Sequence, residues 1–236
     1  MKHITPILVF FTISFFAQSK KIEVIYKINF IGNFLTEKNQ QNTKLVENFK
    51  GLENALNSIK FYLFAQNGNS LYHVQKTLSK DNETMGEGMA KIFCSYETSY
   101  FRDVENKRLV VSTEFSGKKY YVNNVYEPFV WQISTETKIV NGFLCIKAVG
   151  KDPNRSLPIE AWFCPKIPFQ FGPGEYGNLP GLILELSYGK ISYEAISINF
   201  NSKNKTAVEI PTKDLISQQQ FDTIVQDASA KFMQEK

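Results

Sequence analysis

The sequence has 236 residues, with 27 basic and 23 acidic side chains and a formal net charge of +4. Charges of both signs are interspersed, so the chain lacks the basic stripe that is typical of proteins that bind nucleic acid. A chain of this length can bury one large core, and its 20 phenylalanines and 11 tyrosines favour strands.

The first 19 residues have the organisation of a secretory signal peptide. Lys2 supplies a positive start, Ile4–Phe16 form an apolar segment, and Ala17-Gln18-Ser19 is a small-x-small cleavage site. The apolar segment is shorter than the roughly 20 residues that span a bilayer, and no later segment is long enough to do so. We therefore expect export to the periplasm or the exterior, and one mainly-β domain over residues 20–236.

The segments that follow alternate between short strands and turns. Lys21–Phe34 predicts a strand, and the apolar spacing of Lys44–Asn57 predicts an amphipathic helix. The run Asn67-Gly68-Asn69 lies between two apolar segments and indicates a hairpin, whereas the polar stretch 78–88 is expected to be a loop. Further strands are expected at Tyr100–Val104, Arg108–Phe115, Lys119–Val125, Phe129–Ile133, Phe143–Val149, Leu157–Cys164, Leu182–Tyr188 and Ile191–Phe200.

Near the C-terminus, the spacing of the apolar residues changes from that of a strand to that of a helix. Ser217 and Gln220 form a plausible capping box, and the residues that follow have one apolar face, which predicts a helix over residues 218–234. A run of short strands with helices near both ends predicts a mainly-β fold. We expect a single curved antiparallel sheet or open half-barrel, with the C-terminal helix packed on it and a short helix near the N-terminus.

The stretch from Glu160 to Leu186 is unusual because prolines and glycines alternate with aromatic residues. Proline removes a backbone donor and fixes φ, so residues 165–181 are expected to form a long ordered loop between two strands. A stiff loop loses little conformational freedom on binding. Its rings are therefore expected either to line a binding surface or to close one end of the sheet as part of the core.

This stretch resembles the GLPGLI family of secreted Bacteroidota proteins. The resemblance rests on Leu179-Pro180-Gly181-Leu182-Ile183, on the upstream Trp162-Phe163 pair and on Pro165, and it extends over about residues 96–200. It implies secretion and a β-rich fold, and it implies no particular activity. Asn178 stands where the family has glycine, and asparagine tolerates a left-handed backbone well, so a positive φ is predicted there.

With three cysteines and two histidines, the sequence offers few side chains for nucleophilic catalysis or metal binding. Cys145 and Cys164 lie on two strands joined by a turn near Asn154, whose register places them within one residue of each other. A disulfide between them is one alternative, and Cys94 either remains free or pairs with Cys145 instead. His73 is the only histidine after residue 19 and has no partner motif, so no metal site and no cofactor is expected.

A binding module is the favoured function. Its expected ligand is an apolar small molecule or another envelope protein, held by a speculative site at Arg155, Trp162, Phe169, Phe171, Tyr176, Asn178, Leu179, Pro180 and Gly181. One alternative is a hydrolase that uses Glu160, Glu175 or Asp152, with Glu185 also beside the loop and Arg155 to orient the substrate. Another is a structural partner of an outer-membrane receptor.

Overall fold

The computed structural model describes residues 21–31, 37–75, 83–125, 129–151, 158–202 and 208–234. The predicted signal peptide and Arg155 lie outside these ranges. Within them, no helix combines the length and the apolar character that crossing a bilayer requires.

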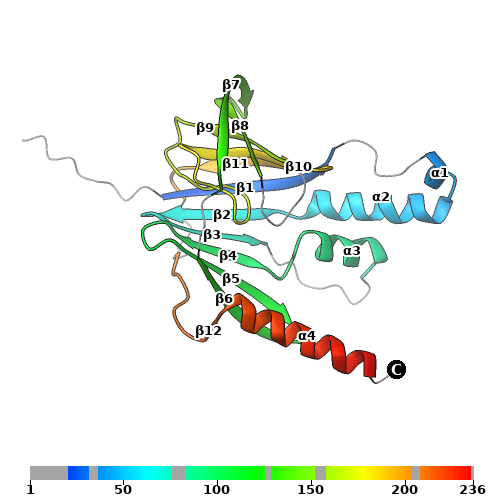
Figure 1. Ribbon diagram of the computed structural model, residues 1–236. Helices are drawn as coiled ribbons and strands as arrows, with labels where there is room; N and C mark the ends of the chain where they lie inside the picture. Colours follow the sequence, from blue (N-terminus) through cyan, green and yellow to red (C-terminus); the bar gives the residue numbers. More distant parts are fainter. Residues whose placement is uncertain are drawn as a thin grey trace, which may run out of the picture.

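The described chain forms one open sheet of twelve strands and four helices, so the predicted mainly-β fold is confirmed (Figure 1). The strands lie in the order β12-β6-β5-β4-β3-β2-β1-β11-β10-β9-β8-β7. Neighbours are antiparallel except β12 and β6, which are parallel. The strands are β1 (Lys21–Phe30), β2 (Phe61–Gln66), β3 (Asn69–Val74), β4 (Ser99–Asp103), β5 (Arg108–Phe115), β6 (Lys118–Val125), β7 (Trp131–Val140), β8 (Phe143–Lys151), β9 (Pro158–Cys164), β10 (Leu182–Tyr188), β11 (Ile191–Asn199) and β12 (Leu215–Ile216).

The strand β1 occupies the middle of the sheet and organises the core. Its side chains alternate strictly, with Ile22, Val24, Tyr26 and Ile28 buried, as the period of two predicts. It pairs with β2 on one side and with β11 on the other, which brings residues from the two ends of the sequence together. This pairing places β1 between the β2–β3 hairpin and the β10–β11 hairpin.

The helices lie at one end of the sheet and along its β6 edge (Figure 1). They are α1 (Glu37–Gln40), α2 (Thr43–Ser58), α3 (Met85–Phe93) and α4 (Gln218–Gln234). The predicted helices at 44–57 and 218–234 are confirmed as α2 and α4. The ring of Phe221 in α4 packs 6.2 Å from that of Phe115 and 5.5 Å from that of Tyr120, so the C-terminal helix does pack on the sheet.

Two sequence predictions about single elements were wrong, and one short strand was missed. The polar stretch 78–88 was expected to be a loop, but α3 begins at Met85 behind a capping box of Thr84 and Glu87. The strand expected at 129–133 is the longer β7, which continues to the Asn141-Gly142 turn because threonines and charged residues alternate on an exposed strand. The short β12 was missed because it is only two residues long.

The hairpin predicted at Asn67-Gly68-Asn69 is confirmed. Gln66 pairs with Asn69 across the turn, and both Asn67 and Gly68 have positive φ, of 52° and 81°. Two successive positive φ values are the signature of the type I′ turn that Asn-Gly favours. The local sequence alone thus determines the register of β2 and β3.

Candidate ligand-binding site

The loop 165–181 is packed against the sheet. The exposed fractions of Trp162, Phe169, Phe171 and Tyr176 are 8%, 8%, 3% and 4%. Leu179 and Gly181 are also buried, Asn178 is half-buried, and Pro180 is exposed. These four rings therefore contribute to the core, which is one of the two alternatives that the sequence left open for them, and the loop forms a fixed wall of the fold.

A buried arginine on β4 holds this loop in place. Arg102 is only 1% exposed, and its guanidinium donates from Nη1 to the Tyr176 carbonyl at 3.0 Å and from Nη2 to Asn178 Oδ1 at 3.1 Å. The same group lies 5.2 Å from the ring centre of Phe171. Hydrogen bonds from a charged donor are stronger than neutral ones, so this contact is a major anchor of the loop.

A second anchor comes from the other end of the sheet. The indole Nε1 of Trp131, at the start of β7, donates to the Gly177 carbonyl at 2.8 Å. Successive carbonyls of residues 176 and 177 are thus bound by side chains from β4 and β7. The predicted left-handed backbone at Asn178 is confirmed, with a φ of 64°.

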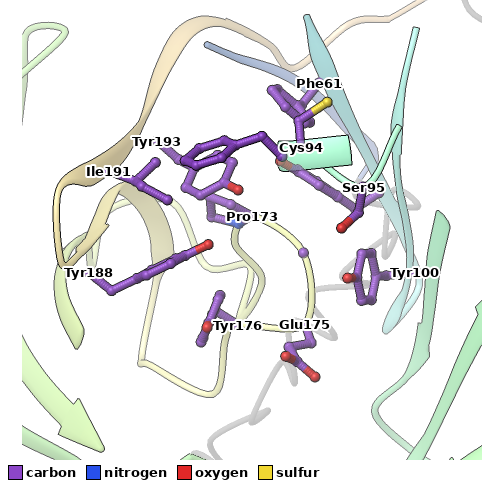
Figure 2. Close-up of a pocket in the computed structure, with 13 residues that line it drawn as sticks. Phe61, Cys94, Ser95, Tyr100, Pro173, Glu175, Tyr176, Tyr188, Ile191 and Tyr193 are labelled. Carbon is purple, nitrogen blue, oxygen red and sulfur yellow. The ribbon is translucent and has the colours of Figure 1, made fainter. Parts of the chain in front are cut away.

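Beside this loop lies a cavity of about 220 Å³ that tyrosines dominate (Figure 2). Its walls come from β2 to β4, from the C-terminal end of α3, from the β10–β11 hairpin and from the loop. The lining residues are Phe61, Tyr72, Phe93, Cys94, Ser95, Tyr100, Pro173, Gly174, Glu175, Tyr176, Tyr188, Ile191 and Tyr193. Of the predicted site residues that the structure describes, Tyr176 is the one that lines it.

The rings around the cavity support one another. Phe61 and Tyr72 are stacked with centres 5.8 Å apart, and Tyr72 and Tyr100 are tilted at 6.3 Å. The ring of Tyr193 lies edge-on to Phe61 at 5.6 Å and is 6.3 Å from the ring of Tyr188. Such aromatic pairs fix the ring planes, so the cavity is largely formed before any ligand enters.

The hydroxyl of Tyr72 is the unusual group in this cavity. The residue is 5% exposed, and among the described residues its hydroxyl has no hydrogen-bond partner. Burial, together with the nearby phenols of Tyr193, Tyr26 and Tyr100, raises the pKa of Tyr72 well above its usual value. The group is therefore neutral at physiological pH and can both donate and accept a hydrogen bond.

The pKa of Tyr193 is raised in the same way as that of Tyr72. Burial raises its pKa well above the ordinary value, and the neighbouring Tyr188, with which it shares a hydrogen bond, raises it further. The wall of the cavity thus contains the neutral phenols of both Tyr72 and Tyr193. Sequence reasoning missed these residues because they lie on strands that meet only through the long-range pairing of β1 with β11.

The thiol of Cys94 also lines the cavity, but it is not an activated nucleophile. Burial raises its pKa to about 12, so the reactive thiolate is scarce at neutral pH. The thiol contacts the Lys91 carbonyl at 3.7 Å, at the end of α3. This cysteine acts as a packed apolar side chain in the wall.

Trp162 belongs to a separate charged cluster. Its ring lies 4.3 Å from Lys138 Nζ and 5.8 Å from Lys147 Nζ, and its Nε1 donates to Glu160 Oε1 at 2.9 Å. Lys138 pairs with Glu185 at 2.7 Å, and Lys147 pairs with Glu160 at 3.0 Å. The structure therefore separates Trp162 from Tyr176, which sequence reasoning had grouped in one site.

The two described carboxylates proposed for hydrolysis, Glu160 and Glu175, line different hollows of the structure. Burial by itself would raise the pKa of Glu160, but hydrogen bonds from Lys147 and Trp162 stabilise its charged form and bring the pKa below its usual value. Glu175 lines the tyrosine cavity instead, and Asp152, like Arg155, lies outside the described residues. A search of the described residues finds no cluster of three or more His, Cys, Asp or Glu side chains with the geometry of a metal site.

Cys145 and Cys164 face each other across β8 and β9. Ile146 pairs with Phe163, so one further step of the antiparallel register sets Cys145 opposite Cys164. Both are fully buried, and both are free thiols in the structure. Burial and the neighbouring Cys164 raise the pKa of Cys145 to about 12. The disulfide remains a prediction.

Comparison with known proteins finds a local match to one family profile and a similarity in fold. The sequence profile of a family described as "Protein of unknown function (Porph_ging)" matches residues 151–185, which include the loop. No curated protein matches the sequence.

Two solved structures of PNGF-II, in space groups P21 and C2, are similar in fold, with TM-scores of 0.56 and 0.58 and 13% sequence identity. The similarity covers 86% and 87% of this chain but 32% of each PNGF-II chain. The chain therefore spans about a third of the length of PNGF-II. At this level of identity the likeness concerns the arrangement of the strands and helices.

Proposed function

We propose that this protein binds a small organic ligand in the tyrosine-lined cavity. The observation that carries the proposal is the buried Tyr72 hydroxyl, which has no partner among the described residues. Leaving a buried hydroxyl unsatisfied costs about 1–3 kcal/mol. A ligand with a polar atom at this position recovers that free energy, whereas a purely structural cavity gives no reason to retain the hydroxyl.

The dimensions of the cavity limit the ligand. Its volume of about 220 Å³ exceeds that of engineered protein cavities of ~150 Å³ that bind benzene. One ring with a short substituent fills it. The ring faces of Phe61, Tyr72 and Tyr193 supply the apolar contact, and the phenol hydroxyls supply the polar one.

Binding fits the chemistry of the cavity better than catalysis. The Cys94 thiol is held in its unreactive form, and the lysine-bound Glu160 is a poor proton donor because its pKa is lowered. We therefore rank the hydrolase and the receptor-assembly role below ligand binding. Residues 1–19 support export, so the ligand would be taken up in the periplasm or outside the cell, as in a secreted protein of the GLPGLI type.

A larger side chain in the cavity wall should prevent a small aromatic ligand from binding. We expect Cys94→Met to abolish the saturation-transfer NMR signal of benzyl alcohol, because the longer side chain enters the space that the ring needs. Cys94→Ala is the matched control, and it should retain the signal because it adds no volume.

Native mass spectrometry of the protein purified from its own source should show a bound organic molecule that Cys94→Met lacks. Equal benzyl alcohol binding by the wild type and by Cys94→Met would place the ligand elsewhere and contradict the proposal.

A further inference from the structure

The helices α2 and α3 lie side by side at one end of the sheet, and their backbones approach each other closely (Figure 1). A Cβ on Gly86 of α3 would lie 2.5 Å from the Gly51 carbonyl carbon and 2.8 Å from the Leu52 nitrogen of α2. These atoms belong to the backbone of a helix, which cannot rotate aside as a side chain can. Glycine at position 86 is therefore required for this distance between the two helices.

The contact between the two glycines is asymmetric. A Cβ on Gly51 would meet the Gly86 Cα at 3.6 Å, which is an ordinary van der Waals distance. The helix α2 is fixed on the core by Leu52 and Leu56, which are 4% and 2% exposed. An alanine is therefore accommodated at position 51, whereas an alanine at position 86 must displace α3.

The position of α3 depends on few contacts. The helix has nine residues, and a helix of this length is not stable by itself in water. Its side chains Met85 and Ile92 are 65% and 83% exposed, and its fully buried positions are Gly86 and Ala90. The close approach to α2 is therefore a main determinant of where α3 lies.

The C-terminal end of α3 forms part of the cavity wall (Figure 2). Phe93, the C-cap residue Cys94 and Ser95 all line the cavity. The backbone turns at Ser95, whose φ is 50°, and the Tyr96 N–H donates to the Lys91 carbonyl at 2.9 Å, which closes the turn onto the helix. A displacement of α3 therefore carries these wall residues with it, whereas the lining residues on β2, β3, β10 and β11 stay with the sheet.

We infer that Gly86 is a positioning residue for the tyrosine-lined cavity. Through its contact with α2 it sets the place of the α3 end, and thereby the size of the ligand that fits. Gly86 is not among the described residues that line the cavity, so it acts through α3. This inference rests on the proposed function, because it concerns the same cavity, and it goes further in assigning the size selectivity to a helix contact outside the wall.

Two alcohols of different size test the inference. Their dissociation constants are measured by NMR titration, with benzyl alcohol as the one-ring probe and naphthylmethanol as the two-ring probe. Gly86→Ala should change the ratio of the two constants about fivefold, because a wall that moves affects the larger ring system differently from the smaller one. Gly51→Ala is the matched control and should keep the wild-type ratio, because its Cβ fits against α3.

The outcomes separate this inference from the proposed function. A Gly86→Ala protein that unfolds at a lower temperature but keeps the wild-type ratio would show that the glycine contact serves stability alone, and it would overturn the inference while the proposed function stands. If neither alcohol bound to the wild type, both would be overturned.

Hydrogen exchange of the wild-type protein tests the same inference without a substitution, and it decides if Gly86→Ala does not fold. The amide of Cys94 donates to the Ala90 carbonyl at 3.0 Å, and that of Tyr96 donates to the Lys91 carbonyl. Saturating benzyl alcohol should slow the exchange of both amides at least about twofold, because a filled cavity supports the wall that they belong to. Unchanged exchange at both amides with the ligand bound would show that the α3 end is not coupled to the cavity and would overturn the inference.

Discussion

Replacing Gly177 with alanine should destabilise the protein by about 3 kcal/mol, because overpacking in a closed region costs that much when nothing can move aside. A Cβ at this position would lie 2.1 Å from Arg102 Nη1 and 2.5 Å from the Gln170 carbonyl oxygen. Arg102 is itself fixed by its hydrogen bonds to Tyr176 and Asn178. The added methyl must therefore displace either the guanidinium or the loop.

Thermal unfolding measures this effect. A loss of about 3 kcal/mol corresponds to a fall in Tm of about 6–12 °C for a protein of this size. Gly88→Ala in α3 is the control, since its Cβ would meet only Glu83 Oε1, at 3.6 Å, and alanine favours a helix. If the two variants unfolded at the same temperature, residues 170–178 would not be fixed by Arg102 as described.

Oxidation of Cys145 and Cys164 should stabilise the protein by about 3 kcal/mol, the usual contribution of a disulfide that closes a loop of this length. The two residues face each other in the β8–β9 register and are both fully buried. In the reaction the two thiols are oxidised, a protein disulfide of the export compartment is reduced to two thiols, and the protons pass between them. Because burial raises the pKa of Cys145 to about 12, we expect the bond to form before this part of the core closes.

The intact mass of the protein isolated from an oxidising compartment tests this bond. We expect a mass lower by two hydrogens than that of the protein treated with reductant, and a lower Tm after reduction. Cys145→Ser and Cys164→Ser should each remove the response to reductant, whereas Cys94→Ser should keep it. A disulfide that is lost in Cys94→Ser would show that Cys94 and Cys145 pair instead.

Elements whose signals are local could be predicted from the sequence. The Asn67-Gly68 turn, the apolar spacing of α2 and the Ser217 cap of α4 each depend on residues a few positions apart. In the structure, Ser217 Oγ accepts from the Gln220 backbone N–H at 3.1 Å, as the capping box requires. The same type of signal was present at Thr84 and Glu87, and attention to it would have identified α3.

The cavity could not be predicted, because it depends on contacts between distant parts of the chain. Tyr72 and Tyr193 lie on strands separated in the sheet by β2 and β1, and nothing in their local sequence shows that β1 pairs with β11. Sequence reasoning therefore favoured the loop rings, which are conspicuous, and missed the phenols of the strands. It also missed Arg102, whose role depends on where the loop folds back onto β4.

The most direct measurement compares Tyr72→Phe with Tyr26→Phe. Tyr26 donates its hydroxyl to the Ile183 carbonyl at 2.7 Å, so its loss should lower the free energy of unfolding by about 1–2 kcal/mol. Tyr72→Phe should unfold at the wild-type denaturant concentration or above it, because it removes a buried hydroxyl that has no partner among the described residues, and it should weaken the binding of benzyl alcohol about tenfold. If Tyr72→Phe instead lost stability as Tyr26→Phe does and bound benzyl alcohol with wild-type affinity, the hydroxyl would serve the fold and would take no part in ligand binding.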